Sequence, residues 1–410
     1  MGLCLGKATS GPWRDLPPEI SGEILSRLLS DDDCISYGAV CREWRLATRH
    51  QWLAVPWINL GNGTYQSIAN GTVRHFPTPK WYRARTSFDN WVMYQHKGSG
   101  RCLLRAHFSA STQAIKVPSR YLERMACSVN DKYWAAHGKR ARRTQPMDID
   151  TYRGMKMVVC SSRLVVMRLH GYQFGMTAPN FRLAKYTNML CFVPNQRRPT
   201  AWLPVISPYH HRPSEGSMDI AFYRGKTFAL TLSGKLFCHD LFADVLDSYR
   251  ERQAPLVDHV VEDRPALSFN SYLVVSSDKQ KLLMVHWSRS ITEDNGTTMD
   301  LRVFEADFSE GRWSELKKDL GGQVLFLSRN CSKALAAGSV KHYDHRFQRG
   351  NCVFVLGKEW ARTWTRPAIF GNDTPSYCVY DMVSGETELV SLDGARNMSR
   401  SMSGWFFPSE

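Results

Sequence analysis

Residues 220–238 read IAFYRGKTFALTLSGKLFC, and this stretch indicates the fold of most of the chain. It contains three short runs that are rich in aromatic and other apolar residues. Arg224-Gly225-Lys226 separates the first two runs, and Gly234-Lys235 separates the last two. Glycine in such short breaks is typical of tight turns between antiparallel strands. The stretch therefore predicts three strands joined by two tight turns.

Runs of the same kind recur along the chain. They lie at residues 272–275, 281–287, 301–307, 352–356 and 377–380, and Asn-Gly pairs typical of hairpins occur at 62–63, 70–71 and 295–296. Many short strands with little helix predict a closed all-β array, and we expect a β-propeller. A sandwich or two barrels would give the same pattern. The repeats are too degenerate for blades to be counted by a fixed period.

Residues 13–45 have a different pattern, which predicts a small helical unit. Pro17 and Pro18 suit a first helical turn, and Ser30 with the aspartates at 31–33 suits the start of a second helix. Apolar residues line one stripe on each helix: Ile20, Ile24, Leu25 and Leu28 on the first, and Tyr37, Val40, Cys41 and Trp44 on the second. These helices are too short to bury all of this surface among themselves. We therefore expect the unit to present an apolar face to a partner.

The helical unit resembles an F-box. The resemblance is carried by Leu16-Pro17, Glu19, Ile24-Leu25 and Val40-Cys41-Arg42-x-Trp44-Arg45, with the two halves correctly spaced. It implies docking on the Skp-type adaptor of a cullin ubiquitin ligase. The expected contact and core residues are Leu16, Pro17, Ile20, Ile24, Leu25, Leu28, Val40, Cys41 and Trp44. The alternative is an ordinary helical subdomain packed on the body of the chain.

The rest of the chain resembles the KIB-type β-propeller that follows the F-box in a large plant family. The matching segments are residues 56–60, 218–226, 271–274, 282–285, 303–304, 313–316, 325–332 and 380–382. One departure is visible, because the family's Ser-x-Gly-Trp-Leu segment appears here only as residues 86–92. The resemblance implies a mainly β fold: a three-helix F-box followed by a propeller-like domain.

These patterns divide the chain into four parts. We expect a flexible N-terminus at 1–12, the F-box helical domain at 13–50, the propeller-like domain at 56–400 and a C-terminal tail at 401–410. No apolar run reaches the roughly 18 residues of a membrane span, and the first twelve residues lack the apolar core of a secretory signal. Eleven cysteines without a CxxC pair suggest free thiols in a reducing compartment. The expected location is the cytoplasm, the nucleus or both.

The net charge of +15 is concentrated in one part of the chain. Residues 61–260 carry 29 basic and 12 acidic side chains, a net charge of +17, whereas the flanking parts are each near −1. The densest point comprises Lys139, Arg140, Arg142 and Arg143. This cluster fits a nuclear-import signal or a patch for an acidic partner, and a solvated basic loop is the alternative. We do not expect nucleic acid as a partner, since neither zinc-finger spacing nor an RNP-type aromatic signature occurs.

Aromatic residues accompany this positive charge. Trp81, Tyr82, Trp91 and Trp134 lie in the basic part of the chain. Aromatic rings near arginines suit an interaction surface, and they suit the core of a blade equally well. The core is the place we expect for them.

No pattern in the sequence predicts catalysis. His342 and His345 flank Asp344, and His210 adjoins His211, but a metal site needs three or four ligands in fixed geometry. These histidines fit surface loops better. The chain has no GxSxG or phosphate-cradling GxxxxGK[ST]. We therefore expect no bound metal, no cofactor and no enzymatic activity.

The resulting functional hypothesis is a substrate-recognition subunit of a Skp-cullin-F-box ubiquitin ligase. The F-box would bind the Skp-type adaptor, and the positively charged part of the propeller would bind a target protein that has an acidic surface. Two alternatives remain. One is a scaffold without ligase function that sequesters a partner such as a kinase, and the other, based on charge alone, is a nucleic-acid-associated protein.

Overall fold

The structure is a computed structural model of the whole chain. It describes residues 13, 16–28, 31–45, 56–61, 63–68, 71–76, 78–99, 101–106, 114–117, 156–161, 164–173, 184–192, 201–203, 217–231, 234–239, 271–291, 297–337, 349–356, 376–392 and 404–407. The basic cluster at 139–143 and the histidine pairs at 210–211 and 342–345 lie outside these residues. None of the helices in the described part is long and apolar enough to cross a membrane.

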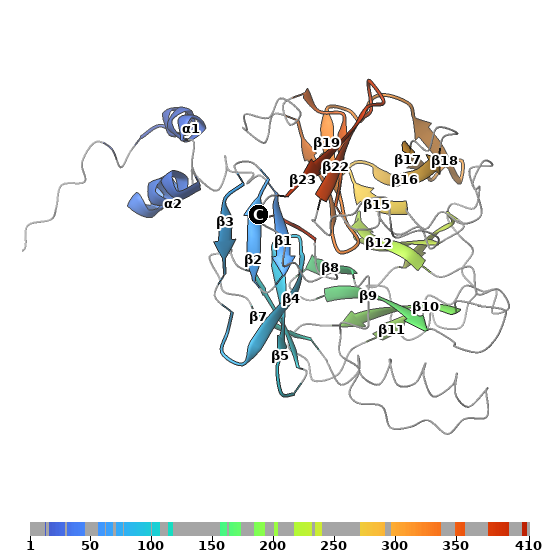
Figure 1. Cartoon of the computed structure of the whole chain (residues 1–410), viewed down its shortest axis with the longest axis horizontal. Helices are drawn as coiled ribbons and strands as arrows, with labels where there is room; N and C mark the ends of the chain where they lie inside the picture. Colours follow the sequence, from blue (N-terminus) through green and yellow to red (C-terminus); the bar gives the residue numbers. More distant parts are fainter. Residues whose placement is uncertain are drawn as a thin grey trace, which may run out of the picture.

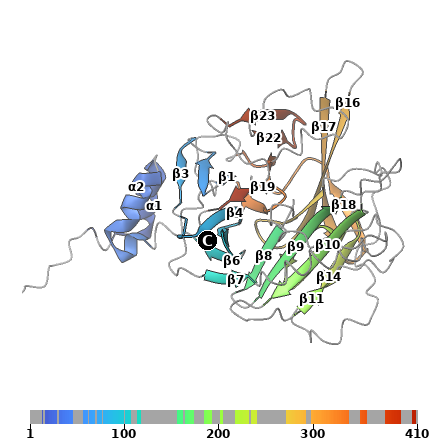
Figure 2. The same cartoon turned by 60° about the horizontal axis from the view of Figure 1, so that its bottom comes forward.

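Two short helices form the N-terminal unit. They are α1 (Pro18–Arg27) and α2 (Asp31–Val40), and one more helical turn follows at residues 42–45. The helices lie beside the sheets, on the side of strand β3, in both cartoon views (Figures 1 and 2).

The strands form six sheets within the part of the chain that the structure describes. The first contains β24 (Trp405–Phe406), β1 (Trp57–Gly61), β2 (Thr64–Ser67) and β3 (Val73–His75). The second contains β4 (Tyr82–Phe88), β5 (Trp91–His96), β6 (Cys102–Ala106) and β7 (Ala114–Val117). The third contains β8 (Lys156–Ser161), β9 (Leu164–Gln173), β10 (Ala184–Phe192) and β11 (Ala201–Leu203).

The other three sheets are built from the second half of the chain. One contains β12 (Ser217–Tyr223), β13 (Lys226–Thr231) and β14 (Leu236–His239). The next contains β15 (Ser271–Val275), β16 (Leu282–Ile291), β17 (Thr297–Asp307) and β18 (Arg312–Leu316). The last has the order β20 (Ser332–Ala336), β19 (Gln323–Leu327), β21 (Cys352–Leu356), β22 (Ser376–Asp381) and β23 (Thr387–Ser391).

The sheets follow one another around a common centre (Figure 1). Strand β4 lies beside β8, β8 beside β12, β12 beside β15, and β15 beside β20, so one strand of each sheet faces the next sheet around the ring. Strands β24 and β1 lie beside β4. This is a β-propeller with a small helical unit at the N-terminus, as the sequence predicts, and it is neither a sandwich nor a pair of barrels.

The hairpin between β12 and β13 shows why the sequence pattern is informative. Arg224 and Gly225 have φ angles of 46° and 79°, so both central turn residues are left-handed. Such a turn matches the twist of the strands that it joins. The predicted strands at residues 220–223, 227–231 and 236–238 lie within β12, β13 and β14, and the prediction of three strands with two tight turns is confirmed.

The last described residues are part of the propeller. Trp405 and Phe406 form β24, which pairs antiparallel with β1 through Ile58 and Trp57. A tail at 401–410 is therefore the wrong description of residues 404–407. Local patterns do not show which distant strand a two-residue segment pairs with, although three consecutive aromatic residues at 405–407 do indicate burial.

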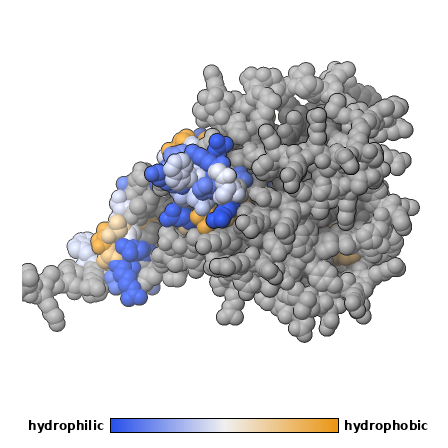
Figure 3. Space-filling model, turned by 90° about the horizontal axis from the view of Figure 1, so that it is seen from below, coloured by the Kyte–Doolittle hydropathy of each residue, from blue (hydrophilic) through white to orange (hydrophobic). Residues whose placement is uncertain are grey.

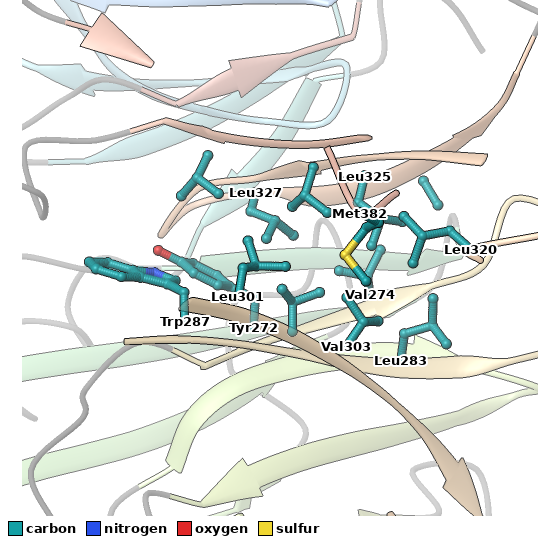
Figure 4. Close-up of a cluster of buried hydrophobic side chains, with 14 residues drawn as sticks. Tyr272, Val274, Leu283, Trp287, Leu301, Val303, Leu320, Leu325, Leu327 and Met382 are labelled. Atoms are coloured by element: carbon teal, nitrogen blue, oxygen red, sulfur yellow. The ribbon is translucent and has the colours of Figure 1, made fainter. Parts of the chain in front are cut away.

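The apolar cores lie between neighbouring sheets. Figure 4 shows one of them, in which side chains of β15, β16 and β17 face side chains of β19. Its members include Tyr272, Val274, Leu283, Val303, Leu325 and Leu327. A second core places Trp405 and Ile58 of the first sheet with Phe326 and Phe354 of the last sheet, so β24 packs against the last sheet.

A buried ion pair joins strands around the centre of the ring. Lys156 Nζ lies 2.8 Å from Asp219 Oδ2, and the two side chains are 5% and 3% exposed. The same Asp219 oxygen accepts a hydrogen bond from the backbone N–H of Leu273, and Lys156 Nζ also lies 3.4 Å from Ser332 Oγ. These residues come from β8, β12, β15 and β20, so one polar cluster connects four sheets.

We expect Trp405→Ala to destabilise the propeller by about 3–5 kcal/mol. The side chain is completely buried, and its Nε1 donates a hydrogen bond to the carbonyl of Leu327 at 2.7 Å. Urea denaturation followed by circular dichroism would measure the change. Leu389→Ala is the control, because this side chain is 51% exposed. Equal stability of the two variants would contradict the role of β24.

Replacement of Lys156 by Met should cost about 3–5 kcal/mol of unfolding free energy, because a buried carboxylate loses its ammonium group. The matched control is Lys281→Met. That lysine forms an ion pair with Glu305 at the surface, with side chains 46% and 30% exposed, and its loss should cost less than about 1 kcal/mol. The same denaturation experiment compares them, and similar costs would show that burial of the central pair is unimportant.

Candidate adaptor-binding site

Helix α1 begins where the two prolines predict. Pro18 is its first residue, and the carbonyl of Pro17 accepts the first helical hydrogen bond, from the Ser21 N–H at 2.9 Å. A proline here costs no hydrogen bond, because the first N–H groups of a helix have no helical partner. Glu19 lies in the first turn, where its negative charge is favoured by the helix dipole.

A buried polar contact joins α1 to α2. The hydroxyl oxygens of Ser21 and Tyr37 lie 2.5 Å apart, and both side chains are buried. Leu25, one turn further along α1, is also buried, with 5% of its surface exposed. These three residues form the interior of the helical unit. Because each hydroxyl satisfies the other, the contact holds the helices in one relative position.

Trp44 is held in place from three directions. Its ring stacks on Tyr37 with centroids 4.2 Å apart and an angle of 19° between the planes. Its Nε1 donates a hydrogen bond to the carbonyl of Trp13 at 2.8 Å, and its backbone N–H lies 3.4 Å from Cys41 Sγ. The ring is half-buried. Trp44 therefore ties the last helical turn and the segment before α1 to α2.

The predicted residues divide into two groups by exposure. Leu25 points into the unit, and Leu16, Ile24, Leu28, Cys41 and Trp44 are half-buried. Pro17, Ile20 and Val40 are exposed, with 50% of Ile20 and 62% of Val40 accessible. Exposed isoleucine and valine on so small a unit leave apolar surface for a partner to cover. Direct contact of these residues with an adaptor stays a prediction.

Two residues of the site were not predicted from sequence. Trp13 is 67% exposed, and its carbonyl accepts the Trp44 hydrogen bond. Ser21 forms the buried contact with Tyr37. A tryptophan just before a helix start is a usable signal for Trp13. A serine within a helix gives no comparable signal, because its partner lies 16 residues away.

The described side chains include no evident metal site. No three His, Cys, Asp or Glu side chains in this part of the chain are placed to hold a metal ion. Burial raises the pKa of the Cys331 thiol to about 12, and it raises the pKa of the Cys378 thiol to about 12. Both thiols are therefore protonated at neutral pH and are poor nucleophiles.

The comparisons with known families agree with this architecture. The chain belongs to the KIB1-4 beta-propeller family, whose model matches residues 65–381. An F-box-like model matches residues 13–53. The resemblances to an F-box and to a KIB-type propeller are both confirmed. F-box domains generally bind Skp-type adaptors, and this pair of domains is typical of non-catalytic substrate-recognition proteins.

Other comparisons add little. A comparison with curated proteins gives no significant match. Among solved structures, the chain is similar to MPT-1, a GDP-Man-dependent mannosyltransferase from Leishmania mexicana, with 7% identity over 86% of this chain and 91% of that chain and a TM-score of 0.27. It is also similar to an alpha-L-arabinanase from Penicillium chrysogenum. The identity is 8% over 82% of this chain and 88% of that chain, and the TM-score is 0.27. These likenesses carry no argument about function.

We expect Leu25→Ala to destabilise the helical unit by about 2–5 kcal/mol, because it leaves a cavity between the helices. Ile20→Ala removes a side chain that is 50% exposed and should change the stability by less than about 0.5–1 kcal/mol. Hydrogen exchange of the backbone amides of α1 and α2 in the full chain would measure both. An equal loss of protection in the two variants would show that this division into interior and surface is wrong.

Proposed function

We propose that this protein is a substrate-recognition subunit of a Skp-cullin-F-box ubiquitin ligase. The observation that carries the proposal is the exposed apolar surface of the F-box-like unit. Ile20 and Val40 remain accessible although Leu25, Ser21 and Tyr37 already close the interior between the helices. Apolar side chains that the unit itself does not bury are what an adaptor interface requires.

The propeller would then hold the target. A propeller with a net charge of +17 in residues 61–260 suits a protein target with an acidic surface, since opposite charges speed association and favour the correct partner. The covalent chemistry belongs to other subunits of such a ligase. This chain would raise the effective concentration of the target near the transferred ubiquitin. The proposal places the protein in the cytoplasm, the nucleus or both, in a plant cell.

Replacement of Leu16 and Pro17 by alanine should weaken binding to a Skp-type adaptor by about a hundredfold or more, as expected when central interface residues are lost. Leu16 is half-buried and Pro17 is exposed, so the fold should be retained. Co-purification of the full chain with adaptor and cullin, followed by titration calorimetry with the adaptor, would measure the effect.

A second variant tests the same surface independently. Ile20→Asp with Val40→Asp places charges on the exposed apolar positions and should have a similar effect, because burying an unpaired charge is costly. Val383→Ala, at an exposed apolar position of the propeller, is the control and should bind normally. Undiminished adaptor binding by both F-box variants would refute the interface. Adaptor binding without turnover of a bound target would favour the scaffold alternative.

A further inference from the structure

One exposed tryptophan of the propeller has an unusual backbone conformation. Trp81 is 64% exposed and has a φ angle of 71°, in the left-handed region. It immediately precedes β4, at the end of that strand where the chain enters the second sheet. The expectation that Trp81 lies in a blade core is therefore wrong. Tyr82, the next residue, is only half-buried, and its ring packs edge-on against His96 at 5.1 Å.

The left-handed backbone of Trp81 is energetically unfavourable, and the exposed ring offsets little of this energy by packing. A left-handed backbone is rare for a bulky residue and costs about 1–2 kcal/mol, whereas glycine adopts it freely. Two backbone hydrogen bonds maintain the turn, from Tyr82 N to the Pro79 carbonyl at 3.0 Å and from Lys97 N to the Trp81 carbonyl at 2.8 Å. Neither of them requires the indole ring. Strain of this kind, retained around an exposed aromatic ring, is typical of binding sites.

Several basic residues lie close to Trp81 at this end of the sheet. Lys80 Nζ lies 5.6 Å from the centroid of the Trp81 ring, within cation–π distance. The backbone N–H of Lys97 donates to the Trp81 carbonyl, so Lys97 lies across from Trp81, one residue beyond the pairing of Tyr82 with His96. Arg83 follows two residues after Trp81, at the same end of β4. The side chains of Lys80, Arg83 and Lys97 are exposed, and none forms an ion pair with an acidic side chain among the described residues. We call Lys80, Trp81, Arg83 and Lys97 the Trp81 surface.

No acidic residue of this region offsets the charge. From residue 61 to residue 106 the chain has seven basic residues and a single acidic one, Asp89. Asp89 lies in the turn at the far end of β4, roughly 26 Å along the strand from Trp81 at the usual rise per residue, and it forms an ion pair with Lys333 at 2.8 Å. Seen from below, the coloured residues range from strongly hydrophilic to hydrophobic, with hydrophilic ones prominent (Figure 3). The Trp81 surface thus combines one exposed aromatic ring with exposed basic side chains that form no ion pair among the described residues.

We propose that the Trp81 surface binds an acidic, extended segment of a target polypeptide, with one apolar side chain of that segment against the Trp81 ring. The proposal rests on the proposed function, because it names the part of the propeller that recognises the target. Charge complementarity selects an acidic ligand. A single exposed ring suits one apolar side chain, whereas single-stranded nucleic acid is usually bound by several aromatic rings that stack successive bases.

The test is a selection of random dodecamer peptides displayed on phage, with the full chain as bait, both alone and in the presence of a Skp-type adaptor. We expect enrichment of sequences rich in Asp and Glu that contain at least one large apolar residue. The best of these peptides should bind Trp81→Ala at least about tenfold more weakly, and Lys97→Glu more weakly still, since hot-spot tryptophans and facing charges dominate such contacts. Val383→Ala and Lys318→Glu are the matched controls at exposed positions elsewhere, and they should bind normally.

Trp81→Gly separates binding from folding. Glycine relieves the left-handed strain, so the thermal midpoint should be unchanged or raised by about 1–2 °C, while peptide binding falls as it does in Trp81→Ala. A lowered midpoint would mean that the ring stabilises the fold, and this result would overturn the proposal.

The remaining outcomes are also decisive. No enrichment, enrichment of sequences that are not acidic, or equal binding by Trp81→Ala would overturn the proposal. So would preferential binding of oligo(dT) or of phosphatidylserine vesicles, tested with the same variants. Loss of adaptor binding with Trp81-dependent peptide binding intact would instead refute the ligase role and leave the site standing.

Discussion

The backbone pairing of β24 with β1 joins the last described residues of the chain to the first strand of the ring. This pairing covers the edge of β1 and fixes the two ends of the ring to each other, and an exposed strand edge would otherwise be open to pairing with another chain. Trp405 strengthens this closure, because it packs against residues of the last sheet and donates a hydrogen bond to Leu327. The arrangement of every sheet, and therefore of every surface that could bind a target, depends on this closure.

The two candidate surfaces, on the helical unit and on the propeller, differ in chemical character. The helical unit has a small interior, formed by Leu25 and the Ser21–Tyr37 contact, and it leaves Ile20 and Val40 accessible. Its binding would depend on burial of apolar area and little on salt. The Trp81 surface combines one ring with the basic side chains of Lys80, Arg83 and Lys97, so its binding would weaken as ionic strength rises. A chain with one apolar and one electrostatic surface can hold two unlike partners at the same time.

The sequence predicted the strands well and their long-range partners poorly. The hairpin at Arg224 and Gly225 could be predicted because turn type depends on the few residues in the turn. The strand at Trp405 was missed because its partner lies near residue 57, and no local pattern specifies such a pairing. In the helical unit the apolar stripes were predictable from periodicity, but periodicity does not distinguish the buried Leu25 from the exposed Ile20. The sequence places Trp81 in a core because aromatic residues suit blade cores, and its left-handed backbone has no signature in the sequence.

The most direct test of the central claim is hydrogen exchange of the full chain with and without a Skp-type adaptor. The account predicts that the adaptor protects backbone amides in residues 16–24 and around Val40, while amides at the Trp81 surface exchange at unchanged rates. Such a result would place the adaptor on the apolar face of the helical unit and leave the propeller available for a target. An absence of protection in the helices, or protection confined to the propeller, would contradict the account.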